Sequence, residues 1–215
     1  MKRVPHQRTG FGPLVAPGIA SAALFCVGCA VFSPAKAQTF GSTYSSTAAK
    51  DCHVSSAGNG VDDSTTRLCL GKAGLKVLVS EDDLRETVSV GRTRTAAARE
   101  PAAQAWFGPF NSTVATVEWR AVDGKPFAII QRWHIDDNEE QDKQGRPIAK
   151  PMLVVTRLPP GPVCHVAYID AKANPDANAL ARNAADAAAR DFRCGKDAVK
   201  VIGESGRAVE LARRR

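Results

Sequence analysis

Hydrophobic and polar residues alternate along several short segments in the first half of the chain, which is the pattern of half-buried β-strands. Leu75, Val77 and Val79 share one face of a predicted strand, and a turn with two glycines connects this strand to another over residues 66–70. Residues 86–90 alternate in the same way. This part of the chain is therefore expected to form antiparallel sheet.

The clearest pair of strands covers residues 114–122 and 126–135. The apolar faces of these strands lie on the same side of an antiparallel pair only if the loop between them has an odd number of residues, for example residues 123–125. This register places Trp119 opposite Ile129.

The same register places four polar residues on the outer face of the pair, namely Glu118, Arg120, Arg132 and His134. A carboxylate, two guanidinium groups and an imidazole on one sheet face are a candidate site. Cross-strand charge pairing on a solvated surface is the simpler interpretation. The sequence therefore identifies a surface cluster, to which it assigns no catalytic role.

Two further strands and one helix complete the predicted fold. Residues 152–158 and 163–169 are apolar on both faces, which is typical of central strands with cover on each side. Asn174 is a suitable N-cap for a helix that begins at Pro175, and Gly195 is a suitable residue to end it. The apolar stripe of this helix is Ala177, Leu180, Ala181, Ala184, Ala188 and Phe192. We expect an α+β fold, a largely antiparallel sheet of about six or seven strands with one alanine-rich C-terminal helix packed on it.

The net charge of +7 is concentrated at the two ends of the chain. Residues 1–37 contain four basic residues and no acidic residue, residues 206–215 contain four basic residues and one acidic residue, and the 21 basic and 21 acidic residues between them cancel. A globular part without net charge has no bulk attraction for polyanions, so nucleic acid is not an expected partner. A hydrophobic content of 44% also excludes a disordered or collagen-like chain.

Residues 1–37 have the pattern of a secretory signal peptide. A basic start precedes an uncharged run over residues 11–32, and small residues precede Gln38 as at a cleavage site. We expect cleavage after Ala37 and export to the periplasm or to the outside of the cell. An uncleaved N-terminal membrane anchor and a lipoprotein modified at Cys29 are the alternatives, and both also place the body of the chain outside the cytoplasm.

Three segments follow the predicted signal peptide. Residues 38–50 are rich in Ser and Thr without periodicity and are expected to be a flexible leader. Residues 51–203 are expected to form a single α+β domain, and residues 204–215 a frayed basic tail. Weak contact with an anionic membrane is expected at most from the last three residues, Arg213, Arg214 and Arg215.

Four cysteines remain after the predicted cleavage, namely Cys52, Cys69, Cys164 and Cys194. An even number of cysteines in an oxidising compartment indicates two disulfides, with three possible connectivities. A strand that begins at Cys164 and a helix that returns over it bring Cys194 back toward Cys164, so we predict the pairs Cys164–Cys194 and Cys52–Cys69. The alternative is a metal site built from the two Cys-His dipeptides, which contain His53 and His165.

The densest acidic run covers residues 136–142 and follows His134. Oxygen-rich loops bind calcium, but Gln141 and Pro147 stand where the EF-hand pattern requires Gly and Glu. A solvated hairpin tip is therefore the expected structure, with a metal-binding loop as the alternative. The chain has no nucleophile elbow, phosphate-binding glycine loop or zinc-protease motif, and we expect no cofactor.

Six short strings resemble, in order and spacing, a group of small exported proteins of unknown function from Gram-negative bacteria. They are Cys-Leu-Gly at 69–71, Val-Ser-Glu-Asp-Asp-Leu-Arg at 79–85, Glu-Trp-Arg at 118–120, Gly-Lys-Pro-Phe-Ala at 124–128, Gln-Arg-Trp at 131–133 and Cys-His-Val-Ala-Tyr-Ile-Asp at 164–170. The resemblance covers residues 52–194. It implies export and brings no reaction, ligand or catalytic residue to this chain.

These observations favour a non-catalytic envelope or periplasmic domain that binds a macromolecular partner or a small ligand. One alternative is a periplasmic hydrolase that uses Glu118 with His134 or His165. Another is a metal-binding protein that uses the acidic run 136–142. A deep pocket shared by Glu118, Arg132 and His134 would favour the enzyme, whereas a flat and solvated sheet face would count against it.

Overall fold

The computed structural model describes residues 38–57 and 64–213 of the chain. The predicted signal peptide and its cleavage site after Ala37 lie outside these residues, apart from Gln38 itself. The described strands are β1 (Phe40–Ser46), β2 (Cys52–Ala57), β3 (Ser64–Leu70), β4 (Lys76–Asp82), β5 (Arg85–Gly91), β6 (Asn111–Val122), β7 (Lys125–Gln141), β8 (Pro147–Arg157), β9 (His165–Asp170) and β10 (Lys200–Val201). The described helices are η1 (Ala49–Asp51), α1 (Arg94–Ala98), η2 (Pro101–Gln104), α2 (Ala177–Ala188) and α3 (Arg207–Arg213).

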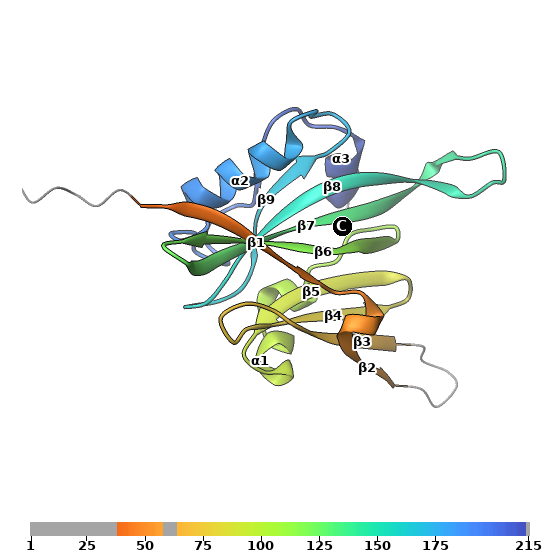
Figure 1. Ribbon diagram of the computed structural model, residues 1–215. Coiled ribbons are helices and arrows are strands. Elements are labelled where there is room, and N and C mark those ends of the chain that lie inside the picture. The colour runs from red at the N-terminus through yellow and green to blue at the C-terminus, as the bar shows by residue number, and fades with distance from the viewer. Residues whose placement is uncertain (1–37, 58–63, 214–215) are drawn as a thin grey trace, which may run out of the picture. The chain divides into compact units, whose positions relative to one another are not determined.

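The strands form one ten-stranded sheet in the order β10-β9-β8-β7-β6-β5-β4-β3-β2, with β1 paired to β6 beside this path (Figure 1). Parallel pairing joins β10 to β9, and joins β5 to β6 at the single pair Arg85 and Asn111, while the other pairings are antiparallel. The predicted α+β class and the largely antiparallel sheet are confirmed. The sheet has more strands than the six or seven expected, because β1, β2 and β10 carry little apolar alternation.

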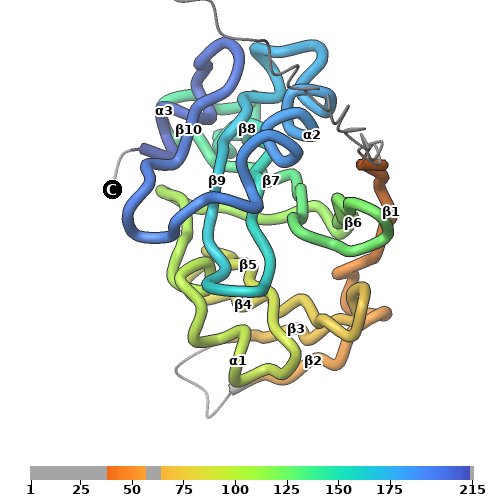
Figure 2. Tube along the Cα trace, turned by 90° about the vertical axis from the view of Figure 1, so that its left-hand side faces the viewer, coloured from red at the N-terminus to blue at the C-terminus, as the bar shows by residue number. Residues whose placement is uncertain are grey.

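Apolar residues pack on both faces of the central strands β6–β9. On one face, β2–β5 fold over and bury a cluster that includes Val79 and Val90 together with Trp119 and Trp133. On the other face, α2 packs on a second cluster that includes Val155. Figures 1 and 2 show α2 and the β3–β5 segment on opposite sides of β7–β9. The central strands are therefore covered on both faces, as their apolar sequences predict.

The register of β6 and β7 is as predicted over residues 117–120, with Trp119 opposite Ile129, and it shifts between Thr113 and Val117. The connection differs from the expected three-residue loop, because Val122 pairs with Lys125 across a two-residue turn. The turn residues Asp123 and Gly124 have positive φ angles of 49° and 77°, as this tight turn requires. Between Arg120 and Ala121 the pairing skips Phe127 of β7, because Arg120 pairs with Ala128 and Ala121 pairs with Pro126. This β-bulge compensates for the shorter turn, so the apolar faces of both strands stay on the same side.

Helix α2 is shorter than predicted, since it begins after Asp176 and ends at Ala188. Asn174 does not cap it. The side-chain amide of Asn174 is buried and donates to the carbonyl oxygens of Asp170 and Glu204, both at 2.9 Å. Asn174 therefore connects the end of β9 to the segment before α3. Asp176 occupies the N-cap position of α2, for which the sequence pattern had favoured Asn174.

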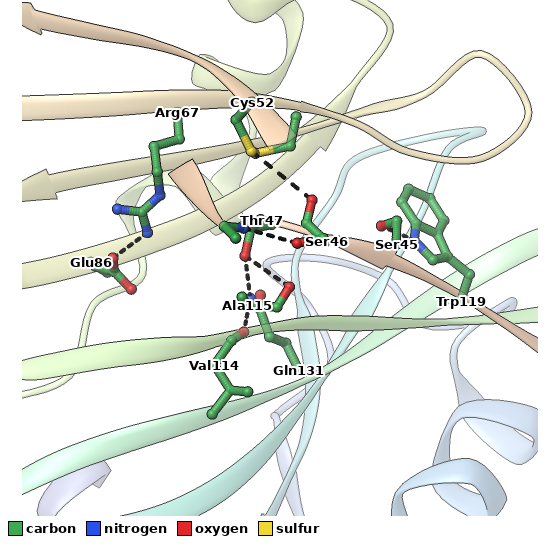
Figure 3. Close-up of a disulfide and its surroundings, with 12 residues drawn as sticks. Ser45, Ser46, Thr47, Cys52, Arg67, Glu86, Val114, Ala115, Trp119 and Gln131 are labelled. Carbon is green, nitrogen blue, oxygen red and sulfur yellow. Dashed lines mark hydrogen bonds and ion pairs between the residues drawn. A yellow bond between two sulfur atoms is a disulfide. The ribbon is translucent and has the colours of Figure 1, made fainter. Parts of the chain in front are cut away.

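Residues 38–50 form β1 and the start of η1, where the sequence favoured a flexible leader. β1 pairs with β6 over seven residues and is also held by side chains. Trp119 donates from Nε1 to the hydroxyl of Ser45 at 2.8 Å, and the hydroxyl of Thr47 donates to the carbonyl of Ala115 at 3.2 Å (Figure 3). A mostly exposed strand leaves no hydrophobic signal, and backbone pairing determines its structure.

The expected frayed tail is wrong for residues 207–213, which form α3. Its buried residues are Ala208, Val209, Leu211 and Ala212, and they join the cluster under β2–β5. Arg207 at its first position pairs with Asp137 of β7. Of the three arginines considered for membrane contact, Arg213 ends α3 and the other two lie outside the described residues. In the described part of the chain, no helix is long and apolar enough to cross a membrane.

Both predicted disulfides are confirmed. Cys52 and Cys69 face each other across β2 and β3, and Cys164 bonds to Cys194 beyond the end of α2 (Figure 3 shows the first). The alternative of a Cys-His metal site is wrong, because both of its sulfurs are in disulfides. Two disulfides indicate an oxidising, extracytoplasmic compartment.

Candidate functional site

The outer face of β6 and β7 is covered by α2 and is not the solvated surface that the sequence suggested. Glu118 and Arg120 are 8% and 7% exposed. Neither forms the expected cross-strand pair. Arg182 donates to Glu118 from Nε at 2.6 Å and from Nη2 at 3.1 Å, and Arg120 donates to Asp186 from Nε at 3.0 Å and from Nη2 at 2.5 Å. Two bidentate ion pairs therefore attach α2 to β6.

Ser42 of β1 connects the two ion pairs. Its hydroxyl donates to the carboxylate of Glu118 at 2.5 Å and accepts from Nη1 of Arg120 at 2.7 Å. This places β1, β6 and α2 around one partly buried charge network. The hydrogen bond with Glu118 raises the pKa of the Arg182 guanidinium above its ordinary value, so Arg182 stays charged there.

A cavity of about 260 Å³, which we call the α2 cavity, lies next to this network. Its apolar floor is formed by Val114, Ile130 and Leu153 from three adjacent strands. Its polar lining is Tyr44, Thr116, Glu118, Arg132, Asn178 and Arg182. Glu118 and Arg132 of the predicted surface cluster therefore share one cavity, while Arg120 lies outside it and His134 does not line it.

Arg132 is the unusual residue of the α2 cavity. It is half-buried, and its guanidinium has no hydrogen bond or ion pair with any of the residues that the structure describes. Its expected neighbour Glu118 is already paired with Arg182 and Ser42. With two guanidinium groups and one carboxylate, the cavity carries one uncompensated positive charge. Partial burial of a charge without a partner costs free energy.

The two histidines of the hydrolase hypothesis do not meet Glu118. His134 lies two residues beyond Arg132 on β7, close enough to Asp136 to lower the pKa of that carboxyl group, although burial raises this pKa by more. His165 lies on the opposite face of the sheet, where its ring stacks on Phe107 with 5.7 Å between centroids. Neither of these two imidazoles therefore lies at the carboxylate of Glu118.

The acidic run 136–142 continues β7 as an extended arm, and its first part is not the solvated tip that was expected. Asp137 is fully buried and accepts from Arg207 at 2.7 and 2.8 Å, with Lys150 at 3.9 Å. The hydrogen bond with Arg207 is the main cause that lowers the pKa of Asp137 to about 2. Lys150 also pairs with Glu140 at 2.5 Å.

Lysine and arginine side chains therefore pair with four of the five carboxylates on which the metal-binding alternative depends, namely Asp137, Glu139, Glu140 and Asp142. Among residues 38–57 and 64–213, no group of three or more His, Cys, Asp or Glu side chains is arranged to hold a metal ion. Four polar residues of the α2 cavity were not predicted as site residues from the sequence, namely Tyr44, Thr116, Asn178 and Arg182. The i, i+4 spacing of Arg182 and Asp186 is visible in the sequence, but such a pair is typical of a solvent-exposed helix face and does not by itself indicate a site.

No protein-family model, curated protein or solved structure matches this chain.

Proposed function

We propose that the protein is a non-catalytic extracytoplasmic domain that binds a small organic carboxylate in the α2 cavity. The observation that carries the proposal is the half-buried guanidinium of Arg132, which has no partner among the described residues. A bound carboxylate would supply that partner, because a planar guanidinium and a carboxylate form two parallel hydrogen bonds.

The other polar groups of the cavity suit the same ligand. The hydroxyl of Tyr44 lies 3.4 Å from Nη2 of Arg182, and the amide of Asn178 is a further donor in the lining. Val114, Ile130 and Leu153 would contact the apolar part of the ligand. The volume of about 260 Å³ is slightly below the range of about 300 to 1,000 Å³ for typical ligand pockets, so the ligand is a small acid.

Charge favours a monoanion over a dianion such as phosphate. The pair of Glu118 and Arg182 is neutral as a unit, which leaves only the charge of Arg132 to compensate. A second negative charge on the ligand would face the carboxylate of Glu118 in the same cavity. A monocarboxylate with an apolar body therefore fits both the charge and the lining.

The lining supports binding and offers little for turnover. Its carboxylate is held by Arg182 and Ser42, and the described residues contribute no histidine or cysteine to it. Histidine, cysteine and unpaired carboxylates are the commonest general bases and nucleophiles, and a hydroxyl such as that of Tyr44 or Thr116 needs an adjacent base to activate it.

Calorimetric titration of the purified protein with a panel of aliphatic and aromatic monocarboxylates tests this proposal. At least one acid is expected to bind, and Arg132→Met is expected to lower its affinity by about a hundredfold. The matched control is Arg146→Met, since Arg146 is an exposed arginine at the tip of the β7–β8 arm whose partner is Asp142. Equal binding by the wild type and by Arg132→Met, or binding of none of the acids, would contradict the proposal.

A further inference from the structure

A second and larger cavity, which we call the Trp106 cavity, lies between the segment before β6, the β7 arm and α3. Its volume is about 410 Å³, within the range of about 300 to 1,000 Å³ that small-molecule sites occupy. It is lined by Arg85, Trp106, Gly108, Pro109, Asp137, Asn138, Glu139 and Leu211. None of these residues lines the α2 cavity, so an inference about it is independent of the proposed carboxylate site.

The indole of Trp106 forms part of the wall and is held in place by Arg85. Trp106 is 40% exposed, whereas Trp119 and Trp133 are 0% and 1% exposed. The guanidinium carbon of Arg85 lies 5.0 Å from the ring centroid of Trp106 and 5.3 Å from that of Phe110, and Arg85 also pairs with Asp83. These contacts fix an exposed aromatic ring at a cavity before any ligand arrives.

The charged groups of the Trp106 cavity already have partners, unlike Arg132. Asp137 and Glu139 both pair with Arg207, Glu139 at 2.6 Å, and Arg85 pairs with Asp83. Arg207 also pairs with Glu210, and Lys150 pairs with both Asp137 and Glu140, so the lining has no uncompensated positive charge for an anionic ligand. A cation on the indole of Trp106 would lie close to the guanidinium of Arg85, which repels it. The lining favours a neutral ligand.

The remaining groups suit a ligand with one apolar face and several hydroxyl groups. Trp106, Pro109 and Leu211 form the apolar part of the wall. Asn138 is exposed and makes no side-chain hydrogen bond among the described residues, so its amide offers both a donor and an acceptor. The carboxylate of Glu139 is 64% exposed and offers a further acceptor beside its pair with Arg207.

We infer that the Trp106 cavity binds a neutral sugar. The C–H face of a pyranose ring packs on the indole of Trp106, because the negative face of an aromatic ring attracts weakly positive C–H groups. The hydroxyl groups of the sugar exchange hydrogen bonds with Asn138 and Glu139. The sugar combines an apolar ring face with several hydroxyl groups, and the cavity combines an apolar wall with polar groups that can bond those hydroxyls.

Titration of the purified protein with glucose, N-acetylglucosamine, maltose and cellobiose, followed by calorimetry and tryptophan fluorescence, tests this inference. At least one neutral sugar is expected to bind and to change the fluorescence, since Trp106 is the exposed indole of the described residues. Glucosamine and glucuronate are the charged analogues and are expected to bind at least about tenfold more weakly than the neutral sugar that binds best.

Three variants connect the binding to the cavity. Trp106→Ala is expected to lower the affinity by about tenfold or more, and Asn138→Ala by about fivefold. The control is Phe40→Ala, which also removes an exposed ring beside an arginine, since Arg190 lies 5.5 Å from the ring centroid of Phe40 and neither residue lines the cavity. The control variant is expected to bind the sugar as the wild type does.

Failure of all four neutral sugars to bind would overturn the inference. So would equal binding of glucuronate or glucosamine, or an affinity that Trp106→Ala leaves unchanged. If Trp106→Ala does not fold by circular dichroism, Asn138→Ala decides, because Asn138 is exposed and its side chain bonds no described residue. Unchanged affinity in Asn138→Ala then overturns the inference.

Discussion

Arg182 on α2 donates from Nε to the carboxylate of Glu118 on β6 at 2.6 Å. In the next ion pair along both elements the charges are reversed, because the helix supplies the acidic residue, Asp186, and the strand supplies the basic residue, Arg120. Four residues of a helix advance about 6 Å, and two residues of a strand advance about 6.6 Å. The spacing of Arg182 and Asp186 along α2 therefore nearly equals the spacing of Glu118 and Arg120 along β6, so both ion pairs form at the same time.

Asp186→Ala is expected to destabilise the protein by about 3 kcal/mol, because it leaves the buried guanidinium of Arg120 without its carboxylate. Urea unfolding followed by circular dichroism measures this change in the free energy of unfolding. The double variant Arg120→Met with Asp186→Ala is expected to recover most of the loss, since it removes both charges.

The matched control removes an exposed pair. Asp142→Ala breaks the bond with Arg146 at the tip of the β7–β8 arm and is expected to cost no more than about 1 kcal/mol. If Asp186→Ala costs as little as Asp142→Ala, the pair of Arg120 and Asp186 does not hold α2 on the sheet.

Arg132→Met is expected to raise the free energy of unfolding of the unliganded protein by about 1 kcal/mol, while it lowers the affinity for the carboxylate by about a hundredfold. The reason is that the half-buried guanidinium of Arg132 has no partner among the described residues, whereas a methionine side chain packs beside Ile130 and Leu153 without a desolvation cost. Chemical denaturation without added acid measures the gain. A loss of stability comparable to that of Asp186→Ala would show that Arg132 is a structural residue and not a binding residue.

The strands that the sequence predicted share one property. Leu75, Val77 and Val79 recur at every second position and are buried on one side of their strand, as Trp119 and Ile129 are in theirs. The order of residues in the sequence therefore shows which side of each strand is buried. β1 lacks that signal because it is mostly exposed, and its structure comes from backbone pairing with β6. α3 has seven residues, too few for a periodic pattern to stand out from an arginine-rich end.

The candidate site was predictable in part for the same reason. Register alone placed Glu118 and Arg132 on one face, and the structure keeps them in one cavity. The partners of Glu118 come from β1 and α2, which lie 76 and 64 residues away along the chain. Only the way in which the helix docks decides whether Glu118 pairs with Arg182 or with Arg132, and no local pattern contains that information.

Val209→Ala is expected to destabilise the protein by about 2 kcal/mol, because Val209 is fully buried in the cluster shared by α3 and β2–β5. This result would distinguish a docked C-terminal helix from the frayed tail that the basic sequence suggested. Arg213→Ala at the exposed end of α3 is the control and is expected to change the free energy of unfolding by no more than about 0.5 kcal/mol. Equal stability of the two variants in thermal unfolding would contradict the docking of α3.

Stability is expected to fall as the pH falls from about 4 to about 2, in part because Asp137 must be protonated. Arg207 holds the pKa of Asp137 at about 2 in the folded protein, below the ordinary value of 3.8 that applies to the unfolded chain. The unfolded state therefore binds a proton first, so the contribution of this carboxylate is complete above pH 4 and is lost toward pH 2.

The variant Asp137→Asn isolates this contribution. It is expected to be less stable than the wild type at pH 7, because Arg207 and Lys150 lose the charge of their buried partner, and to lose less stability than the wild type between pH 4 and pH 2. Urea unfolding at a series of pH values measures both curves. Asp191→Asn is the control, because Asp191 is exposed and forms no ion pair among the described residues. Parallel curves for the wild type and Asp137→Asn over this pH range would show that the pair of Asp137 and Arg207 does not contribute to the acid sensitivity of the fold.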